Sequence, residues 1–414
     1  MTGAAPAPTV GPTAFNIGTH RSVPPAVTAE RIRGRLSEFG ITRVAELTGL
    51  DHVGIPVMAA YRPAATSLVV SMGKGLTADA AYASATMESI ELWHAERPAL
   101  DIVVGSARAL AHDHEIVDWS TMSRVARQTF DENTTTAWVV ARSFTDGRPA
   151  LVPYGVVHTD GTAAERGDGG HFLCTSNGLA SGNVAVEAQV HALCELIERD
   201  ATTTWRLAGR RLDTVVAAEA VTDPAARELL GRLAAAGLRA VVDDITSDIG
   251  IPTAHCTVFE PTDDPDACVL ATAGMGTHPD PSVALARAVT EAAQSRLALI
   301  SGARDDLFRP HYQPPEDADL LYLAMTRRWE TARVSRRAWL ATTGPPVATL
   351  EGDLALVVDE LGRHGLEAWW VDLTMPGIGV AVGRAVVPGL EMLNDVAHYT
   401  PGPRARAVAM SGSA

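Results

Sequence analysis

The sequence is short of cysteine and of long apolar runs, and each shortage excludes a class of protein. Its four cysteines lie far apart and form no CxxC pair, which argues against a zinc ribbon or a disulfide framework. No run of about 18 apolar residues occurs, so no membrane span is expected. The first residues, MTGAAPAPTVGPT, lack the basic start and apolar stretch of a signal peptide. We therefore expect a cytoplasmic protein.

Basic charge is also scarce. The net charge of −15 over 414 residues leaves no basic stripe, so neither nucleic acid nor an anionic membrane is an expected partner. Of the 34 lysine and arginine residues only one, Lys74, is a lysine. A compact ammonium and a planar guanidinium are not interchangeable. The surviving lysine therefore reflects either chance or a site that arginine cannot fill.

Periodicity and turn residues predict an α/β or α+β fold. The expected helices are 28–39 with Thr28 as N-cap, 77–96, 185–206 and 282–301, and the expected strands are 67–72, 137–142 and 150–157. The long glycine-rich stretch Asp160–Asn183 indicates a functional loop, or one that is disordered until substrate arrives.

Two segments echo each other. Residues 237–251 and 365–379 each read as a glycine helix cap, a strand, a turn and a second strand, and they align Asp244 with Asp372 and Thr246 with Thr374. The echo predicts a duplicated helix–strand–strand unit. The alternative is that such sequences commonly look alike.

Three expected helices carry carboxylates among apolar residues. Their polar positions are Ser84, Glu88 and Glu91; then Glu187, His191, Glu195 and Glu198, followed by Arg199; then Arg287, Glu291 and Gln294. Residues at i, i+4 and i+7 share one helix face. Taken singly, each face is most simply a solvated surface with ion pairs worth about 0.2–0.5 kcal/mol.

Taken together, the three faces predict a cation site. If they converge, two like charges about 4 Å apart cost roughly 4 kcal/mol at an effective dielectric constant of about 20. Five or six carboxylates outnumber one or two arginines, so divalent cations are needed. Mg²⁺ prefers carboxylates together with substrate phosphates. Because Gly73-Lys74-Gly75 lacks the GxxxxGK[ST] spacing, the predicted nucleotide site is not a P-loop.

At these residues the sequence resembles the YcaO family. The matching blocks are GKGLTADAAYASATMESIE (73–91), TSNGLASGNVAVEAQVHALCELIERDA (175–201), ALARAVTEAAQSR (284–296) and VVPGLE (386–391). The resemblance implies a disordered tail at 1–14, a catalytic domain at 15–405 and a flexible tail at 406–414. It also implies a YcaO-type α/β (α+β) fold, with mixed sheets and three central carboxylate-bearing helices.

The resemblance further implies ATP and Mg²⁺ as cofactors. The residues it marks as catalytic metal ligands are Glu88, Glu91, Glu195, Glu198 and Glu291, with Arg199 as a catalytic phosphate contact. The residues it marks around the nucleotide are Arg21, Thr28, Lys74, Ser84, Asn183, Glu187, Arg199 and Arg287.

The implied reaction is activation of a peptide amide, whose oxygen takes the γ-phosphoryl group of ATP before a nucleophile displaces phosphate. The blocks QSRLALISGARDD and VVPGLE…GPRA look like the TfuA-associated subgroup, which favours sulfide as the nucleophile and a thioamide as the product. Azoline or macroamidine formation without a partner, and an accessory role in another pathway, stay open. The expected partners are a ribosomally made precursor peptide and a TfuA-type protein, and a homodimer stays open.

Overall fold

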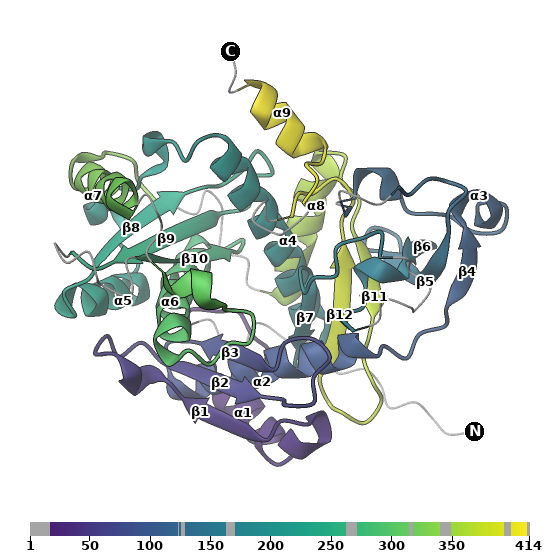
Figure 1. The fold of residues 1–414 in the computed structure, drawn as a ribbon, viewed down its shortest axis with the longest axis horizontal. Coiled ribbons are helices and arrows are strands. Elements are labelled where there is room, and N and C mark those ends of the chain that lie inside the picture. Colours follow the sequence, from purple (N-terminus) through teal and green to yellow (C-terminus); the bar gives the residue numbers. More distant parts are fainter. Residues whose placement is uncertain are drawn as a thin grey trace.

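The computed structural model describes residues 17–122, 124–125, 129–162, 170–261, 271–313, 318–339, 349–392 and 399–411, whose strands form three sheets (Figure 1). The first has the order β1 (Arg43–Glu46), β2 (Val57–Tyr61), β3 (Val70–Lys74). The second has the order β10 (Ala271–Thr277), β9 (Thr253–Phe259), β8 (Arg239–Asp244). The third has the order β4 (Val103–Ser106), β5 (Thr135–Ser143), β11 (Trp369–Asp372), β12 (Ala381–Val386), β7 (Leu179–Gly182), with β6 (Pro149–Pro153) on β5.

The pairs between the named strands are all antiparallel, so the prediction of mixed sheets was wrong for them. The parallel pairing that the structure describes is an isolated bridge between Ile116 and Leu151 of β6. The helices are α1 (Pro25–Arg33), α2 (Ala78–Glu96), α3 (Ala107–Leu110), α4 (Ala185–Leu207), α5 (Pro224–Ala235), α6 (Pro281–Ser301), α7 (Ala318–Val334), α8 (Leu350–Arg363) and α9 (Pro403–Ser411). Helices and antiparallel sheets together confirm the predicted α+β class.

Each carboxylate-bearing helix directly follows a strand at the edge of a sheet. Strand β3 leads into α2, β7 into α4 and β10 into α6. Glycines in these strands let the helix backbone approach closely: a Cβ on Gly73 would lie 2.0 Å from the backbone nitrogen of Ala85, and one on Gly276 would lie 2.0 Å from the carbonyl oxygen of Ala284. In Figure 1 the three sheets surround the region where α2, α4 and α6 meet.

The predicted helix–strand–strand unit occurs twice, as α5–β8–β9 and as α8–β11–β12. The two copies share their turn. The N–H of Thr246 donates to Asp244 (3.2 Å), and that of Thr374 donates to Asp372 (2.9 Å). Each threonine hydroxyl then accepts a backbone N–H from the following strand, at 3.1 Å in both copies. The sequence echo therefore corresponds to a repeated local structure.

Some predicted boundaries were wrong. The first helix begins at Pro25 rather than at Thr28, because proline suits the first helical position, where the backbone N–H needs no partner. It ends at Arg33, and residues Leu36–Phe39 form a separate 3₁₀ turn. The first predicted strand is shifted from 67–72 to Val70–Lys74.

The predicted tails fared differently. Residues 1–14 lie outside the described part of the chain. Of the predicted flexible tail at 406–414, residues 406–411 belong to α9, whose first turn is anchored by Arg404, which pairs with Asp200 at 2.8 Å, and by the N–H of Ala405, which donates to Glu391 at 2.9 Å. Residues 412–414 lie outside the described part of the chain. Within the glycine-rich stretch, residues 163–169 lie outside the described part, and the end of the stretch forms β7.

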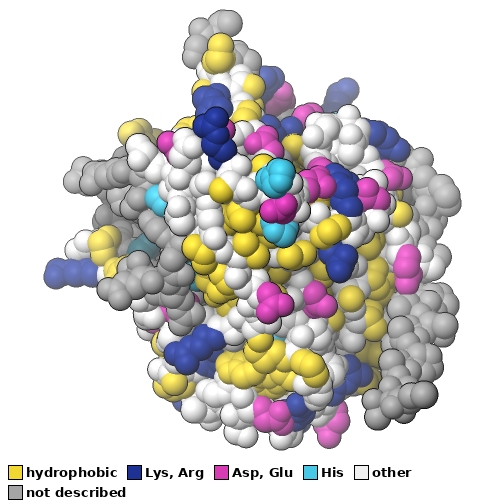
Figure 2. Space-filling model, turned by 90° about the vertical axis from the view of Figure 1, so that its right-hand side faces the viewer, with side chains coloured by type: hydrophobic (Ala, Val, Ile, Leu, Met, Phe, Trp, Pro, Cys, Tyr) yellow, Lys and Arg dark blue, Asp and Glu magenta, His cyan; other side chains and the backbone are white. Residues whose placement is uncertain are grey.

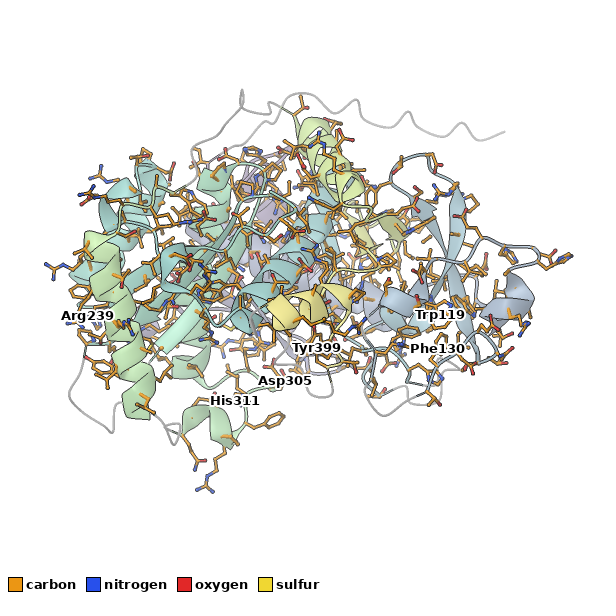
Figure 3. All side chains as sticks on the ribbon, turned by 90° about the horizontal axis from the view of Figure 1, so that it is seen from above. Trp119, Phe130, Arg239, Asp305, His311 and Tyr399 are labelled. Carbon is orange, nitrogen blue, oxygen red and sulfur yellow. The ribbon has the colours of Figure 1, made fainter. Side chains whose placement is uncertain are left out.

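Away from the sheets' meeting point, small apolar clusters close the two ends of the molecule (Figure 3). Beside β4 and β5, the rings of Trp119 and Phe130 pack edge to face with centroids 4.9 Å apart. At the other end, Arg239 stacks its guanidinium 4.3 Å from the ring centroid of Trp329 on α7. The three glutamate-bearing helices lie between these two clusters, at the centre of the molecule (Figure 1).

The face drawn in Figure 2 intersperses basic and acidic side chains with apolar patches. Among the described residues, no helix combines the length and the apolar character needed to cross a bilayer.

Candidate active site

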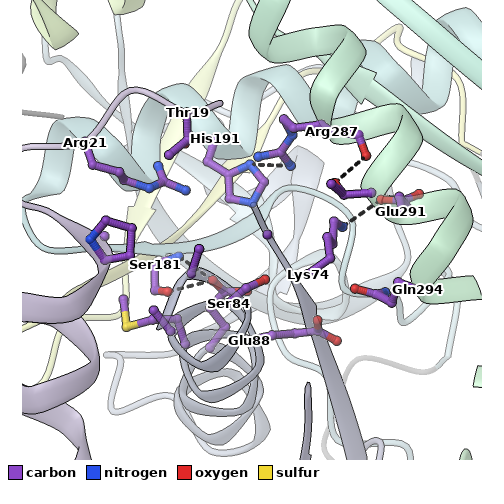
Figure 4. Close-up of a pocket in the computed structure, with 18 of the residues that line it drawn as sticks. Thr19, Arg21, Lys74, Ser84, Glu88, Ser181, His191, Arg287, Glu291 and Gln294 are labelled. Carbon is purple, nitrogen blue, oxygen red and sulfur yellow. Dashed lines mark hydrogen bonds and ion pairs between the residues drawn. The ribbon is translucent and has the colours of Figure 1, made fainter. Parts of the chain in front are cut away.

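All the predicted site residues line one cavity of about 590 Å³ (Figure 4). They come from four parts of the chain: the segment before α1 and α1 itself, the β3–α2 connection with α2, the β7–α4 connection with α4, and α6. The predicted residues that line it are Arg21, Thr28, Lys74, Ser84, Glu88, Glu91, Asn183, Glu187, Glu195, Glu198, Arg199, Arg287 and Glu291. The prediction that the three polar helix faces converge is therefore confirmed.

Helix α2 forms one wall. It is capped by Thr77, whose hydroxyl accepts the N–H of Ala80 at 3.2 Å. One turn apart on the cavity side lie Glu88 and Glu91. Glu91 is fixed by Ser181, whose N–H (2.8 Å) and hydroxyl (2.6 Å) both donate to it. Glu88 makes no hydrogen bond or ion pair with any residue that the structure describes.

Helix α4 forms the opposite wall and holds an arginine between two glutamates. Arg199 donates to Glu195 at 3.1 Å and lies 3.1 Å from Glu198. The second oxygen of Glu195 accepts the N–H of Gly178 at 3.1 Å. This arrangement orients the carboxylates and leaves other edges of all three groups facing the cavity.

Lys74 links the first sheet to α6. Its Nζ lies 2.8 Å from Glu291, whose other oxygen accepts the N–H of Met275 at 3.3 Å. Arg287, one turn before Glu291, instead contacts the ring of His191 at 3.3 Å. The single lysine of the chain therefore lines the cavity (Figure 4).

The N-terminal segment closes the cavity from a fourth side. The hydroxyl of Thr28 donates to Asn183 at 2.9 Å, and the N–H of Asn183 donates to Glu187 at 2.7 Å. The other oxygen of Glu187 accepts the N–H of Ser22 at 2.5 Å. Arg21, beside Ser22, lines the cavity. Thr28 is thus a tertiary contact of the site and not a helix cap.

The charge balance differs from the prediction. The cavity is lined by six carboxylates, Glu88, Glu91, Glu187, Glu195, Glu198 and Glu291. It is also lined by five cations rather than one or two, namely Arg21, Lys74, Arg199, Arg287 and Arg304. The cations therefore nearly match the carboxylates in number, and the need for divalent cations depends on how the individual carboxylates are solvated.

That solvation is poor. Burial raises the pKa of Glu88 to about 7 against the opposing charges of Arg304 and Lys74. Burial also raises the pKa of Glu91 to about 8, despite the hydrogen bonds from Ser181. For Glu291 burial is opposed by the charges of Lys74, Arg199 and Arg287, which together hold its pKa below the usual range. The charges around Glu88 and Glu91 therefore do not compensate for the burial of their carboxylates, whereas those around Glu291 do.

Buried polar atoms without a partner show where a ligand fits. Among the described residues these include the Nε atoms of Arg199 and Arg287 and the Oε1 atom of Gln294. A guanidinium N–H suits a phosphate oxygen, and carboxylates with free oxygens suit Mg²⁺. The donor set of the cavity therefore fits a magnesium nucleotide.

Arg304 is a cavity residue that the sequence did not reveal. It follows Gly302, which ends α6 with a φ of 59°, and two ion-paired contacts to Asp306 fix its side chain, the Nε atom lying 2.7 Å from Oδ1. Because it lies beyond the helix, no periodicity marks it. Gln294 and His191, in contrast, lie on the predicted polar helix faces, but the resemblance implies no role for them.

A comparison with protein-family models matches residues 72–391 to the family described as YcaO cyclodehydratase, ATP- and Mg²⁺-binding. A protein of Rhizobium leguminosarum bv. trifolii, described as an uncharacterized protein in the tfuA 3′ region, is 36% identical over 384 residues, which cover 90% of this chain and 89% of that protein. An uncharacterized protein of Methanothermobacter thermautotrophicus is 34% identical over 382 residues, covering 90% and 96% of the two chains.

Solved structures share the fold. The YcaO protein of Methanopyrus kandleri, bound with AMPPCP and Mg²⁺, has a TM-score of 0.72 at 22% identity and covers 95% of this chain and 98% of its own. A heterocyclase in complex with substrate and cofactor has a TM-score of 0.74 at 22% identity, covering 93% of this chain and 54% of its own. Likeness at this level of identity concerns the fold.

Proposed function

The chain belongs to the YcaO family of ATP- and Mg²⁺-binding proteins, and from that premise we propose that it converts a peptide backbone amide into a thioamide. In this reaction ATP and Mg²⁺ supply the phosphoryl group and its charge neutralisation. The amide oxygen leaves in phosphate, ADP is released, and sulfide takes the place of the oxygen. A ribosomally made precursor peptide is the substrate and a TfuA-type protein is the partner.

The convergence of glutamates from three helices in one cavity carries this proposal. Glu88, Glu91, Glu195, Glu198 and Glu291 would hold Mg²⁺. Glu88 is the most available of them, because it has no partner in the described part of the chain. The backbone N–H groups and hydroxyls that fix Glu91 and Glu195 would pre-set their orientation, as partners behind metal ligands commonly do.

The cations have a separate role. Arg199 and Arg287 would contact phosphate oxygens through the Nε atoms that now lack partners. Phosphoryl transfer depends on positioning and on charge stabilisation more than on a protein nucleophile. Lys74 would hold Glu291 ionised and add a point charge between the first sheet and α6.

The choice of sulfide as nucleophile is supported by one relative. The Rhizobium protein, 36% identical over most of both chains, is described by its place in the tfuA 3′ region. Azoline formation is the competing reaction, since structural neighbours are described as heterocyclases, but at 22% identity that likeness concerns the fold.

The deciding experiment incubates the chain with MgATP, sulfide, a TfuA-type partner and a candidate precursor peptide. We expect peptide-dependent ADP release and a mass gain that corresponds to exchange of oxygen for sulfur. If the peptide instead loses the mass of one water per event without sulfide, the reaction is azoline formation rather than thioamide formation. ADP release that does not depend on peptide, with no change in peptide mass, would overturn both reactions.

The site assignment is tested by binding. Glu198→Gln should abolish measurable MgATP binding in isothermal titration calorimetry while the circular dichroism spectrum stays unchanged. Glu228→Gln is the matched control, because Glu228 is exposed on α5 and pairs only with Arg232 one turn away. Full MgATP binding by Glu198→Gln would remove Glu198 from the proposed metal site.

A further inference from the structure

A second cluster of ionisable groups lies beside the cavity, around His20. The Nδ1 atom of His20 lies 2.7 Å from Oδ2 of Asp353, and its Nε2 atom lies 3.6 Å from Oδ2 of Asp280. The ring also packs edge to face on His278, with centroids 4.7 Å apart. His20 is 8% exposed and Asp353 is fully buried. Three parts of the chain therefore meet at one imidazole: the segment before α1, the start of α6 and the start of α8.

The position of His20 connects this cluster to the nucleotide cavity. Thr19 and Arg21, its two neighbours in sequence, line that cavity. The next N–H, of Ser22, donates to Glu187. On the other side, Asp280 is the N-cap of α6, the helix that carries Arg287 and Glu291. Whatever fixes His20 also fixes residues 19–22 relative to α6.

The cluster has the residue types of a metal site, with His20, His278 and Asp353 offering ligand atoms within 4.8 Å of one another. Two distances favour a proton instead. Two ligands about 2.0–2.1 Å from one tetrahedral Zn²⁺ lie roughly 3.3 Å apart. The 2.7 Å between His20 and Asp353 is shorter and is that of a charge-assisted hydrogen bond, while the 4.0 Å between His278 and Asp353 is longer.

The surrounding charges also favour a single positive charge. The charged groups around His20 and around the small cavity that it shares with His191 and the neutral His278 are Asp280, Asp353, Glu187, Arg21 and Arg287. Three carboxylates against two guanidiniums leave one negative charge. An imidazolium neutralises it, whereas a divalent cation would leave an excess positive charge beside two arginines.

We propose that the His20 imidazolium, clamped between Asp353 and Asp280, is a positioning residue that holds residues 19–22 across the nucleotide cavity and thereby places Arg21. The inference rests on the proposed nucleotide site for its functional meaning. The structural part, a clamp on the segment before α1, stands independently of any ligand.

The electrostatics around the clamp set its pH range. Burial opposes the charge on His20, but the ion pair with Asp280 and the hydrogen bond to Asp353 outweigh it and raise the pKa of His20 to about 9. Burial and the charge of His20 lower the pKa of His278, so this ring is neutral and its Nδ1 accepts the N–H of Asp280 at 2.9 Å. Since the pKa of His20 is raised on folding, the clamp is fully present below pH 6.5 and is lost as the pH rises through about 9.

The test compares His20→Asn and Asp353→Asn with His112→Asn, whose side chain is 89% exposed in the wild type. Hydrogen–deuterium exchange on the ligand-free protein reports the clamp directly. We expect the backbone amides of residues 19–23 to exchange at least about 10-fold faster in both clamp variants, because a charged hydrogen bond contributes on that scale. The wild type should show the same loss of protection above pH 9, and His112→Asn should show no change.

Nucleotide measurements separate positioning from a general structural defect. In both clamp variants the KM for ATP should rise about 10-fold with kcat changed far less, and His20→Lys should restore part of the affinity by returning the charge. Unchanged protection of the amides of residues 19–23 in both variants would overturn the clamp. So would stoichiometric Zn²⁺ binding at pH 7 that His20→Asn abolishes. If protection is lost but the wild type binds no MgATP, the clamp stands and the nucleotide assignment fails.

Discussion

Helix α2 places two glutamates, a buried one and a half-buried one, in opposite surroundings. Near its end, Glu96 is 7% exposed and its carboxylate is surrounded by donors: Arg62 at 2.6 and 3.1 Å, the hydroxyl and N–H of Ser67 at 2.6 and 3.1 Å, and the N–H of Thr66 at 3.2 Å. Two turns earlier, Glu88 faces the cavity without a hydrogen bond or ion pair from the described chain. The same helix thus carries one carboxylate whose oxygens are fully hydrogen-bonded, that of Glu96, and one that lacks a partner in the described chain, that of Glu88.

The difference separates a structural charge from a functional one. A buried charge costs several kcal/mol unless it is paired and hydrogen-bonded. The chain balances Glu96 entirely with its own residues. It leaves Glu88 and Glu91 with pKa values raised by burial, a condition that a bound cation would relieve. The candidate site is therefore marked by carboxylates that the chain itself does not fully compensate, rather than by burial or residue type.

The largest change in stability is expected from breaking the buried ion pair between Glu96 and Arg62. Glu96→Gln leaves the Arg62 guanidinium buried without a counter-charge and should lower the free energy of unfolding by about 3–5 kcal/mol. Urea unfolding followed by circular dichroism measures the loss. The folded fraction should still bind MgATP with unchanged affinity, because Glu96 does not line the cavity. If Glu96→Gln instead lowers the affinity for MgATP and leaves the free energy of unfolding unchanged, the distinction between Glu96 and Glu88 is wrong.

Glu88→Gln should do the reverse. Removal of this unpaired cavity carboxylate should lower the rate of peptide-dependent ADP formation by about 100-fold, which is the scale of deleting one preorganised electrostatic group. The melting temperature of the ligand-free protein should stay the same or rise, since a buried charge is lost. Steady-state ADP assays and thermal melts measure both. A destabilised variant with normal activity would make Glu88 a structural residue like Glu96.

The sequence predicted which residues line the cavity better than it predicted the boundaries and pairing of the elements around it. The three glutamate faces could be read because carboxylates at helical spacing interrupt apolar residues, and the i, i+4 pair of Glu195 and Arg199 forms as expected. Lys74 stood out by being the only lysine in the chain. These signals are local, so no knowledge of the tertiary structure was needed to find them.

What the sequence could not show are contacts between distant segments. Arg304 balances Glu88 from beyond the end of α6, and Arg62 reaches Glu96 across 34 positions. Glu291 pairs with Lys74, 217 positions away, rather than with Arg287 one turn earlier on its own helix. His20 meets Asp353 across 333 positions. Charge balance depends on such pairs, and for that reason the predicted excess of carboxylates was overestimated.

The smallest expected effect is a pH dependence of the ligand-free protein. Because burial raises the folded-state pKa values of Glu88 to about 7 and of Glu91 to about 8, the folded state binds more protons than the unfolded state between pH 4.5 and those values. The free energy of unfolding should therefore fall as the pH rises through this window, by about 1 kcal/mol or more at pH 8. Urea unfolding at pH 5 to 8 without nucleotide measures the slope.

Glu91→Gln is the variant that isolates this slope. Glutamine keeps an oxygen that can accept the two hydrogen bonds from Ser181 but carries no charge. The slope should be shallower in Glu91→Gln and unchanged in Glu228→Gln, whose side chain is 65% exposed. Saturating MgATP should flatten the slope of the wild type, since bound cations stabilise the ionised carboxylates. An identical slope in all three proteins would mean that the cavity carboxylates are solvated as well as Glu228, and the contrast along α2 would then lose its electrostatic basis.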